Sequence, residues 1–141
     1  MIRFCKEEDT RDLAVISSEN VDPAWSREDF NSALKNAQAR VFVTGEKPVG
    51  YGVFYFACDE GEIPSIAVDK SMRRQGIGNE ILGEIIDFAK SQSIRRIFLE
   101  VRQSNTAAIA FYLKNGFSEV GRRPKFYNHP VEDGLILELN L

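Results

Sequence analysis

The chain has 141 residues and a formal net charge of −3, with 43% hydrophobic and 28% charged residues. These fractions are close to those of folded globular proteins, so they argue against a disordered or fibrous chain, and the length is that of one domain. No apolar run approaches the roughly 20 residues of a membrane-spanning helix, and residues 1–8 are too charged for a signal peptide. We therefore expect a single cytoplasmic domain over residues 1–141 with no membrane partner.

Charge is distributed unevenly along the chain. Residues 1–69 contain 7 Lys or Arg and 13 Asp or Glu, whereas residues 70–141 contain 11 and 8. The pI near 5.3 is far below the strongly basic values typical of nucleic-acid-binding domains. The pattern favours a small phosphorylated ligand at the C-terminal half over nucleic acid.

The cysteines and the histidine do not indicate a metal site or a nucleophile. Cys5 and Cys58 each lie in an apolar stretch without C-x-x-C spacing, so we expect both to be reduced core residues and expect no metal. His129 precedes Pro130 in a predicted loop and is expected at the surface.

The first half of the chain predicts a strand, two helices and a hairpin. Residues 2–5 favour a short strand, and apolar residues at helical spacing predict a helix over residues 11–20. After a break at Pro23, Ser26 can cap a second helix that runs to about residue 36. Residues 40–44 and 49–57 are rich in β-branched and aromatic residues on either side of a turn, which predicts a β-hairpin.

The second half predicts further strands that alternate with helices. The predicted strands cover residues 62–68, 96–101, 118–127 and 134–141, with one helix from residue 77 to about 89 and another from a cap at Asn105 or Thr106 through Leu113. Gly116 can end the last helix because glycine tolerates the left-handed conformation. The order β-α-α-β-β-β-α-β-α-β-β describes one mixed α/β domain.

A glycine-containing turn separates the strand at residues 62–68 from the helix that follows. Such a turn offers backbone N–H groups at a helix N-terminus, where a pyrophosphate is stabilised. Gly76 and Gly78 leave room for a ligand, and Arg73 and Arg74 add positive charge. The turn lacks both the third glycine of a dinucleotide fingerprint and the Lys-Ser/Thr ending of a P-loop, which disfavours an unrelated nucleotide-binding protein. An ordinary capped turn remains compatible with these residues alone.

The turn Arg73-Arg74-Gln75-Gly76-Ile77-Gly78 resembles the Arg/Gln-x-x-Gly-x-Gly/Ala coenzyme A signature of the GNAT family of N-acetyltransferases. Residues 66–69, residues 99–102 with Ser104-Asn105, and residues 110–117 resemble further segments of that family in order and spacing. Trp25-Ser26 and Phe126-Tyr127-Asn128 further resemble the RimI branch, whose members acetylate protein N-termini, notably that of a ribosomal protein. The resemblance covers nearly the whole chain and implies the GNAT fold.

The resemblance implies that the chain binds acetyl-coenzyme A through backbone groups of one strand, through the turn and helix start, and through one asparagine. These residues are Ile66, Ala67, Val68, Arg73, Arg74, Gln75, Gly76, Ile77, Gly78, Asn79 and Asn105. Asn79 departs from the basic residue often found at its position in RimI relatives, which implies a weaker phosphate contact. Asn105 is equally placed to cap its helix.

The resemblance also implies two catalytic residues and two substrate-binding residues. Glu100 matches the base that accepts a proton from the attacking amine, although the residues alone equally fit a solvated strand carboxylate. Tyr112 matches the acid that protonates the departing thiolate, or else packs on a buried helix face. Tyr127 and Trp25 match the two walls of the acceptor site, and packing is an equal alternative for each.

The predicted activity is therefore transfer of an acetyl group to a peptide or protein N-terminus, with a ribosomal protein as a possible acceptor and the enzyme a monomer or weak dimer. Attack is expected to be direct, without an acyl-enzyme, because Cys5 and Cys58 match no nucleophile position. Two alternatives stay open: an enzyme of the same family that acts on a small amine or a lysine side chain, and a non-catalytic sensor of acyl-coenzyme A.

Overall fold

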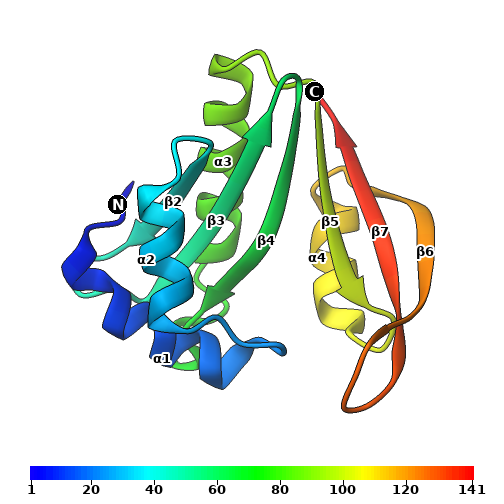
Figure 1. The fold of residues 1–141 in the computed structure, drawn as a ribbon, viewed down its shortest axis with the longest axis horizontal. Helices are drawn as coiled ribbons and strands as arrows, with labels where there is room; N and C mark the ends of the chain where they lie inside the picture. The colour runs from blue at the N-terminus through cyan, green and yellow to red at the C-terminus, as the bar shows by residue number, and fades with distance from the viewer.

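A computed structural model describes residues 1–141 and contains seven strands, four α-helices and two short 3₁₀ helices (Figure 1). In chain order the elements are β1 (Ile2–Phe4), the 3₁₀ helix Glu7–Asp9, α1 (Thr10–Asn20), α2 (Arg27–Lys35), β2 (Ala39–Thr44), β3 (Gly50–Ala57), β4 (Glu60–Val68), the 3₁₀ helix Lys70–Met72, α3 (Ile77–Ser91), β5 (Arg96–Arg102), α4 (Thr106–Lys114), β6 (Ser118–Tyr127) and β7 (Glu132–Asn140). The mixed α/β class and the predicted element order are confirmed.

All seven strands belong to one sheet in the order β1-β2-β3-β4-β5-β7-β6. Every neighbouring pair is antiparallel except β4 and β5, which are parallel and pair only over Glu60–Glu62 and Arg96–Phe98. Beyond this short contact the two strands diverge, so the ribbon opens in a V between them (Figure 1). The sheet is therefore nearly divided into a half ending in β4 and a half beginning with β5.

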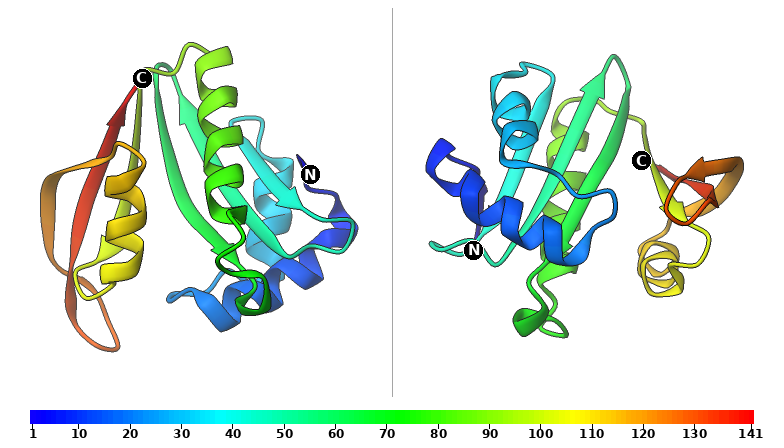
Figure 2. Two further views of the ribbon diagram at one scale, coloured as in Figure 1. Left: turned by 180° about the vertical axis from the view of Figure 1, so that it is seen from behind. Right: turned by 60° about the horizontal axis from the view of Figure 1, so that its bottom comes forward.

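The helices cover the two faces of the sheet unequally. In both views of Figure 2, α3 lies on one face of the first half and α1 and α2 on the other, while α4 covers only one face of the second half. Two cores result. The larger packs α3 and α4 against the sheet and contains Ile81, Leu82, Ile85, Ile97, Leu99, Tyr112 and Leu137. The smaller packs α1 and α2 and contains Leu13, Ile16, Phe30, Val43, Tyr51 and Val53.

Local capping explains where the helices begin. The Ser26 side chain accepts a hydrogen bond from Asp29 N at 3.1 Å, and the Asp29 carboxylate accepts one in return from Ser26 N at 2.8 Å. This reciprocal capping box starts α2. The predicted cap of α4 is confirmed at Asn105, whose Oδ1 accepts from Ala108 N at 3.2 Å. Gly116 follows α4 with a φ of +95°, as expected for the residue after a helix end.

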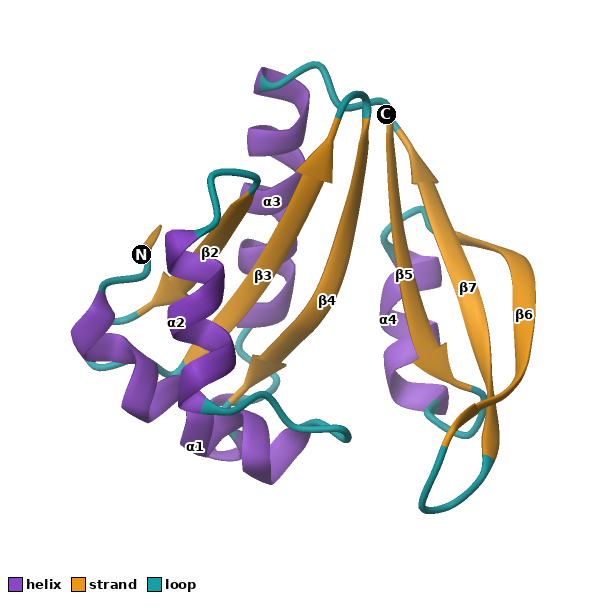
Figure 3. Ribbon diagram, viewed as in Figure 1, coloured by secondary structure: helices purple, strands orange, loops and turns teal.

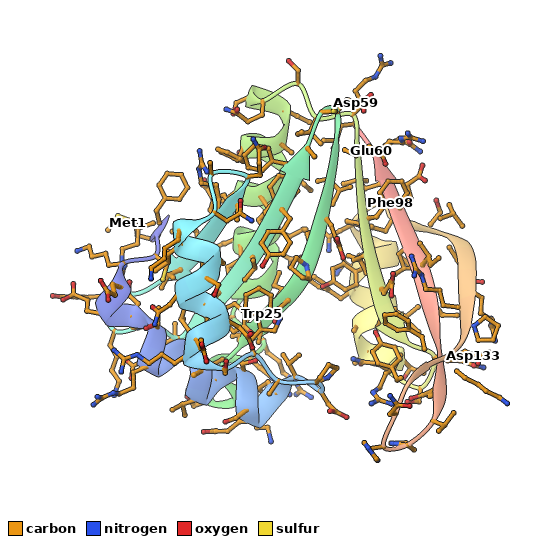
Figure 4. All side chains as sticks on the ribbon, in the orientation of Figure 1. Met1, Trp25, Asp59, Glu60, Phe98 and Asp133 are labelled. Atoms are coloured by element: carbon orange, nitrogen blue, oxygen red, sulfur yellow. The ribbon has the colours of Figure 1, made fainter.

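The prediction that both cysteines are core residues was wrong for Cys58. Cys58 and Asp59 form the two-residue turn that joins β3 to β4, and Asp59 is labelled at this end of the sheet in Figure 4. Cys58 is therefore exposed and has a φ of +56°. The apolar stretch before it continues only to the end of β3. Cys5 is half-buried, and both thiols are free. His129 lies at the surface as expected, and no helix has the length and apolar character needed to cross a membrane.

Candidate active site

A cleft of about 550 Å³ opens where β4 and β5 diverge. Strand residues from both sides line it, and so do the α1–α2 connection, α4 and the end of β6. Its lining contains Trp25, Glu62, Ser65, Ile66, Glu100, Arg102, Asn105, Tyr112, Phe126 and Tyr127. The structure thus brings together in one cleft both predicted catalytic residues and both predicted substrate-binding residues.

The divergence of the strands leaves backbone groups without strand partners. β4 pairs along its length with β3, but its other edge is unpaired beyond Glu62, and β5 has no partner on that side beyond Phe98. Pro64 lies just past the last pair, where its missing N–H costs no ladder bond. Open N–H and C=O groups on β4, including those of the segment 66–68, can therefore pair with the amides of an extended ligand.

A second cavity of about 500 Å³ adjoins the first and leads to the turn before α3. The two cavities share Asn20, Ile66, Asn105, Ala108 and Tyr112. The second is also lined by Ala67, Val68, Arg73, Arg74, Gly76, Ile77, Gly78 and Asn79. Of the residues predicted to hold the coenzyme, only Gln75 does not line it. Its amide Nε2 lies 4.0 Å from Met72 Sδ.

The turn has the backbone geometry of an anion site. Gly76 has a φ of +78° and no side chain caps the start of α3, so the first amides of this 15-residue helix remain available. A Cβ atom placed on Gly76 would meet no atom within 4 Å, which means that open space lies beside the backbone. Arg74 is also left-handed, at +65°, and exposed. These features fit a pyrophosphate.

Several predicted coenzyme residues already have side-chain partners in the protein. Arg73 Nη2 lies 2.5 Å from Asn20 Oδ1, which links the turn to the end of α1. Asn79 Oδ1 accepts a hydrogen bond from Asn115 Nδ2 at 3.2 Å. Because the Asn105 Oδ1 atom caps α4, the Asn105 amide group is the part of this side chain that is left for a ligand.

Glu100 lies on the open face of β5, because alternate residues of a strand point to opposite faces and Leu99 and Val101 are buried in the core. Its Oε1 atom is 3.1 Å from Arg123 Nε, and its Oε2 atom is buried without a hydrogen-bond partner. Burial raises the pKa of the Glu100 carboxyl; Arg123 lowers it and Glu62 raises it. A carboxylate in this setting holds a proton more readily than an exposed one does.

Tyr112 lies at the junction of the two cavities and is 5% exposed. Its ring packs edge-on against Phe111 and Phe117, which fixes its position on α4. Burial raises the pKa of the Tyr112 phenol, with a smaller contribution from Tyr51. The phenol therefore stays protonated at neutral pH and can donate a hydrogen bond into either cavity.

Trp25 and Tyr127 lie on opposite sides of the cleft. Trp25 packs against Phe30 of α2 and Tyr55 of β3, and its backbone N–H donates to Ser17 Oγ at 2.7 Å. Figure 4 shows Trp25 beside α2, over the strands of the half that ends in β4. The connection between α1 and α2 extends from this half toward the β6–β7 turn (Figure 3). Trp25 and Tyr127 thus each pack against neighbouring aromatic rings and also line the cleft.

The cleft residues that were not assigned from the sequence include Glu62, Ser65 and Arg102. Arg102 follows Glu100 by two positions, so strand alternation places both on one face, a signal that was available from the sequence. Ser65 is fixed by a 2.6 Å hydrogen bond to the buried Tyr51 hydroxyl. Glu62 adds a second carboxylate opposite Glu100, and the sequence shows this only once β4 and β5 are known to be neighbours.

The comparisons with known proteins agree with this geometry. The model of the acetyltransferase (GNAT) family matches residues 5–117. The ribosomal protein bS18-alanine N-acetyltransferase of Escherichia coli is 34% identical over 111 residues, covering 78% of this chain and 74% of that enzyme. An uncharacterised protein of Mycobacterium leprae is 47% identical over 123 residues, which cover 82% of this chain but only 33% of that protein.

Structural comparison gives the same result. The crystal structure of the ribosomal-protein-S18-alanine N-acetyltransferase from Escherichia coli superposes with a TM-score of 0.89 at 29% identity. The superposition covers 99% of this chain and 92% of that one. The predicted GNAT fold and the predicted similarity to the RimI branch are confirmed.

Proposed function

Because the chain belongs to the GNAT family of acetyltransferases, we propose that it transfers the acetyl group of acetyl-coenzyme A to the N-terminal α-amine of a protein. The observation that carries the proposal is the single cleft between β4 and β5, which contains Glu100 and Tyr112 and adjoins the anion-binding turn. The family and its relatives support an N-acetyltransferase. The acceptor is inferred from the RimI relatives.

The coenzyme supplies the activated thioester, and this chain supplies the groups that hold it. The unpaired β4 edge over 66–68 lines the second cavity and suits the two amides of a pantetheine arm. The start of α3 and the guanidinium groups of Arg73 and Arg74 suit the pyrophosphate. Asn105 and Tyr112 line both cavities, at the point where the thioester would meet the amine.

Two proton transfers accompany the reaction. Glu100 accepts a proton from the amine, directly or through water, as the nitrogen forms its bond to the acetyl carbon. Tyr112 donates its proton to the sulfur as the carbon–sulfur bond breaks. Burial raises the pKa of Tyr112, so the phenol keeps its proton until the thiolate forms.

An α-amine is a better acceptor for this site than a lysine side chain. Its reference pKa is about 7.7–8.0, against about 10.4 for lysine, so less free energy is needed to produce the neutral nucleophile at pH 7. A single carboxylate such as Glu100 is a sufficient base for that task. We propose an acceptor peptide that begins with Ala or Ser, with the N-terminus of a ribosomal protein as the physiological example, as in the Escherichia coli relative.

Residues 1–141 are proposed to act as one catalytic domain in the cytoplasm, as a monomer or weak dimer. The seven-stranded sheet contributes residues to the cleft from both halves, which is why the domain is proposed to work as a unit.

The test is release of coenzyme A by purified protein given acetyl-coenzyme A and short peptides that differ at the first residue. Chromatographic detection is preferable to a thiol reagent, because Cys58 is an exposed free thiol that would react as well. Spermidine, free amino acids and N-terminally blocked lysine peptides serve as controls. Turnover on Ala or Ser peptides is the expected result.

Turnover on a control acceptor alone would contradict the proposed acceptor and leave the acetyltransferase assignment in place. Coenzyme binding without turnover on any acceptor would instead favour an acyl-coenzyme A sensor.

A further inference from the structure

Arg102 makes contacts on both sides of the acceptor cleft. Its Nη1 atom donates to Pro130 O and Glu132 Oε1, both at 3.1 Å. Its Nη2 atom donates to Asp22 Oδ2 at 2.9 Å and to Asn128 O at 3.0 Å. These four bonds use all four terminal N–H groups of the guanidinium. One side chain on β5 therefore joins the α1–α2 connection to the β6–β7 turn.

The same guanidinium lies against Tyr127. The Arg102 Cζ atom is 4.5 Å from the centroid of the Tyr127 ring, which is a close cation–π contact. The Arg102 side chain is 13% exposed, and its Nε atom is buried without a hydrogen-bond partner. A charged group this enclosed is retained at a cost in solvation, which its contacts to both cleft walls offset.

We propose that Arg102 is a positioning residue that joins the two walls of the acceptor cleft and holds the Tyr127 ring in place for the incoming peptide. This inference rests on the proposed function, because it assigns Tyr127 to acceptor binding. Arg102 contacts neither the α3 turn nor the unpaired edge over 66–68. Its loss therefore affects the acceptor rather than the coenzyme.

The two attachments differ in strength. Glu132 is 16% exposed and its second oxygen accepts a hydrogen bond from Ser104 N at 2.7 Å, so the β6–β7 side is held on two elements. Asp22 is 68% exposed, and ion pairs of that kind contribute little free energy. The α1–α2 wall is thus the one that can detach while Arg102 stays bound to the β6–β7 turn.

The first experiment compares Arg102→Gln with Arg96→Gln, a matched change on the same strand whose partner, Glu60, lies outside the cleft. We expect Arg102→Gln to raise the KM for an Ala peptide at least about tenfold, with kcat and coenzyme affinity changed less than about threefold. Arg96→Gln should leave all three unchanged. Arg102→Lys should recover only part of the loss, because an ammonium has three donors and no planar fork.

A double-mutant cycle separates positioning from general stability. In a Tyr127→Leu background, which has no ring to hold, Arg102→Gln should change KM much less than in the Tyr127→Phe background, which keeps the ring. Equal effects in the two backgrounds would overturn the proposal, and so would a loss of coenzyme affinity that matches the rise in KM.

Hydrogen exchange tests the proposal without turnover, and it also covers the case in which Arg102→Gln folds poorly. In Arg102→Gln, the backbone amides of residues 21–26 and 127–132 should exchange faster than in the wild type. In Asp22→Asn, only the amides of residues 21–26 should exchange faster. The Asp22 carboxylate is exposed, so this change does not disturb the core. Unchanged exchange in both variants would overturn the proposal. If wild-type protein acetylates no peptide, the proposed function fails, whereas the exchange result still decides whether Arg102 joins the two walls.

Discussion

Arg123 Nε lies 3.1 Å from Glu100 Oε1, while the other carboxylate oxygen of Glu100 is buried without a partner. The ion pair holds one oxygen of the proposed base and leaves the second uncommitted. The Arg123 side chain is 56% exposed, so solvent weakens its hold on the carboxylate. The pKa of Glu100 is therefore lowered by a cation on β6, Arg123, and raised by a second carboxylate on β4, Glu62.

The first prediction concerns pH. Burial raises the pKa of Glu100, so the part of the acid limb of kcat/KM that belongs to Glu100 should lie above the ordinary glutamate value of about 4.3, in addition to the limb of the peptide amine at about 7.7–8.0. Arg123→Gln should move that limb to higher pH, because the arginine lowers the pKa. Glu62→Gln should move it to lower pH, because this carboxylate raises it. The peptide amine titrates identically with wild type and both variants, so differences in the position of the limb report the pKa of Glu100. Shifts in the same direction for both variants would exclude Glu100 as the titrating group.

The second prediction concerns Tyr112. Tyr112→Phe should bind acetyl-coenzyme A normally and lower kcat by about 10²–10⁴-fold, as expected for loss of a general acid. The ring contacts with Phe111 and Phe117 survive the change, so the fold is preserved. Tyr55→Phe, which also removes one hydroxyl from a partly buried ring, is the control and should keep full activity. An unchanged kcat in Tyr112→Phe would reduce Tyr112 to a packing residue.

The third prediction compares two glycines of one segment. No atom lies within 4 Å of the position that a Cβ would take on Gly76 or on Gly83, so an alanine at either position causes no steric clash. Gly76 has a φ of +78°, and an alanine there should lower stability by about 1 kcal/mol and weaken coenzyme binding about tenfold. Gly83→Ala, inside α3, should raise stability by about 0.5–1 kcal/mol and leave binding unchanged. Urea unfolding and calorimetric titration measure both quantities; the same sign of stability change in the two variants would contradict the explanation.

The fourth prediction concerns Asp9, which joins β1 to the start of α1. Its carboxylate accepts hydrogen bonds from Arg3 at 2.7 and 2.9 Å and from Lys6 N at 2.7 Å, and Arg3 holds its pKa below the usual value. Asp9→Asn should therefore lower the free energy of unfolding by about 2 kcal/mol at pH 7.

Because the folded pKa of Asp9 is depressed, its contribution is present above the unfolded pKa of about 3.9 and is lost as pH falls through the folded value. The gap between wild type and Asp9→Asn should therefore close below about pH 3.9. Asp12→Asn is the matched control and should change stability little at either pH. A gap that persists unchanged at low pH would mean that the ion pair is not its source.

Much of the fold could be predicted because local signals agreed with tertiary packing. The capping box at Ser26 and Asp29, the cap at Asn105 and the glycine after α4 each place a helix end by short-range hydrogen bonding or backbone conformation. Cys58 was misplaced because a two-residue turn with no glycine gives little signal inside an apolar and aromatic run.

The cleft was only partly predictable. The resemblance supplied Glu100 and Tyr112, but the cleft that both line forms only because β5 lies next to β4, a contact between strands separated by α3. The ion pair between Glu100 and Arg123 and the bridge from Arg102 to Asp22 join residues 23 and 80 positions apart, and no periodicity indicates such pairs. Gln75 shows the reverse: it belongs to the signature, yet it does not line the cavity, and its side-chain amide lies against Met72.

The short ladder between β4 and β5 has a consequence for the catalytic cycle. In the proposed binding mode the open edge of β4 pairs with amide groups, and coenzyme A carries the same amides before and after it has given up its acetyl group. The strands therefore cannot distinguish substrate from product. Coenzyme A should compete with acetyl-coenzyme A at similar concentrations, and the rate at which the spent coenzyme leaves the gap, rather than the chemical step, can then limit turnover.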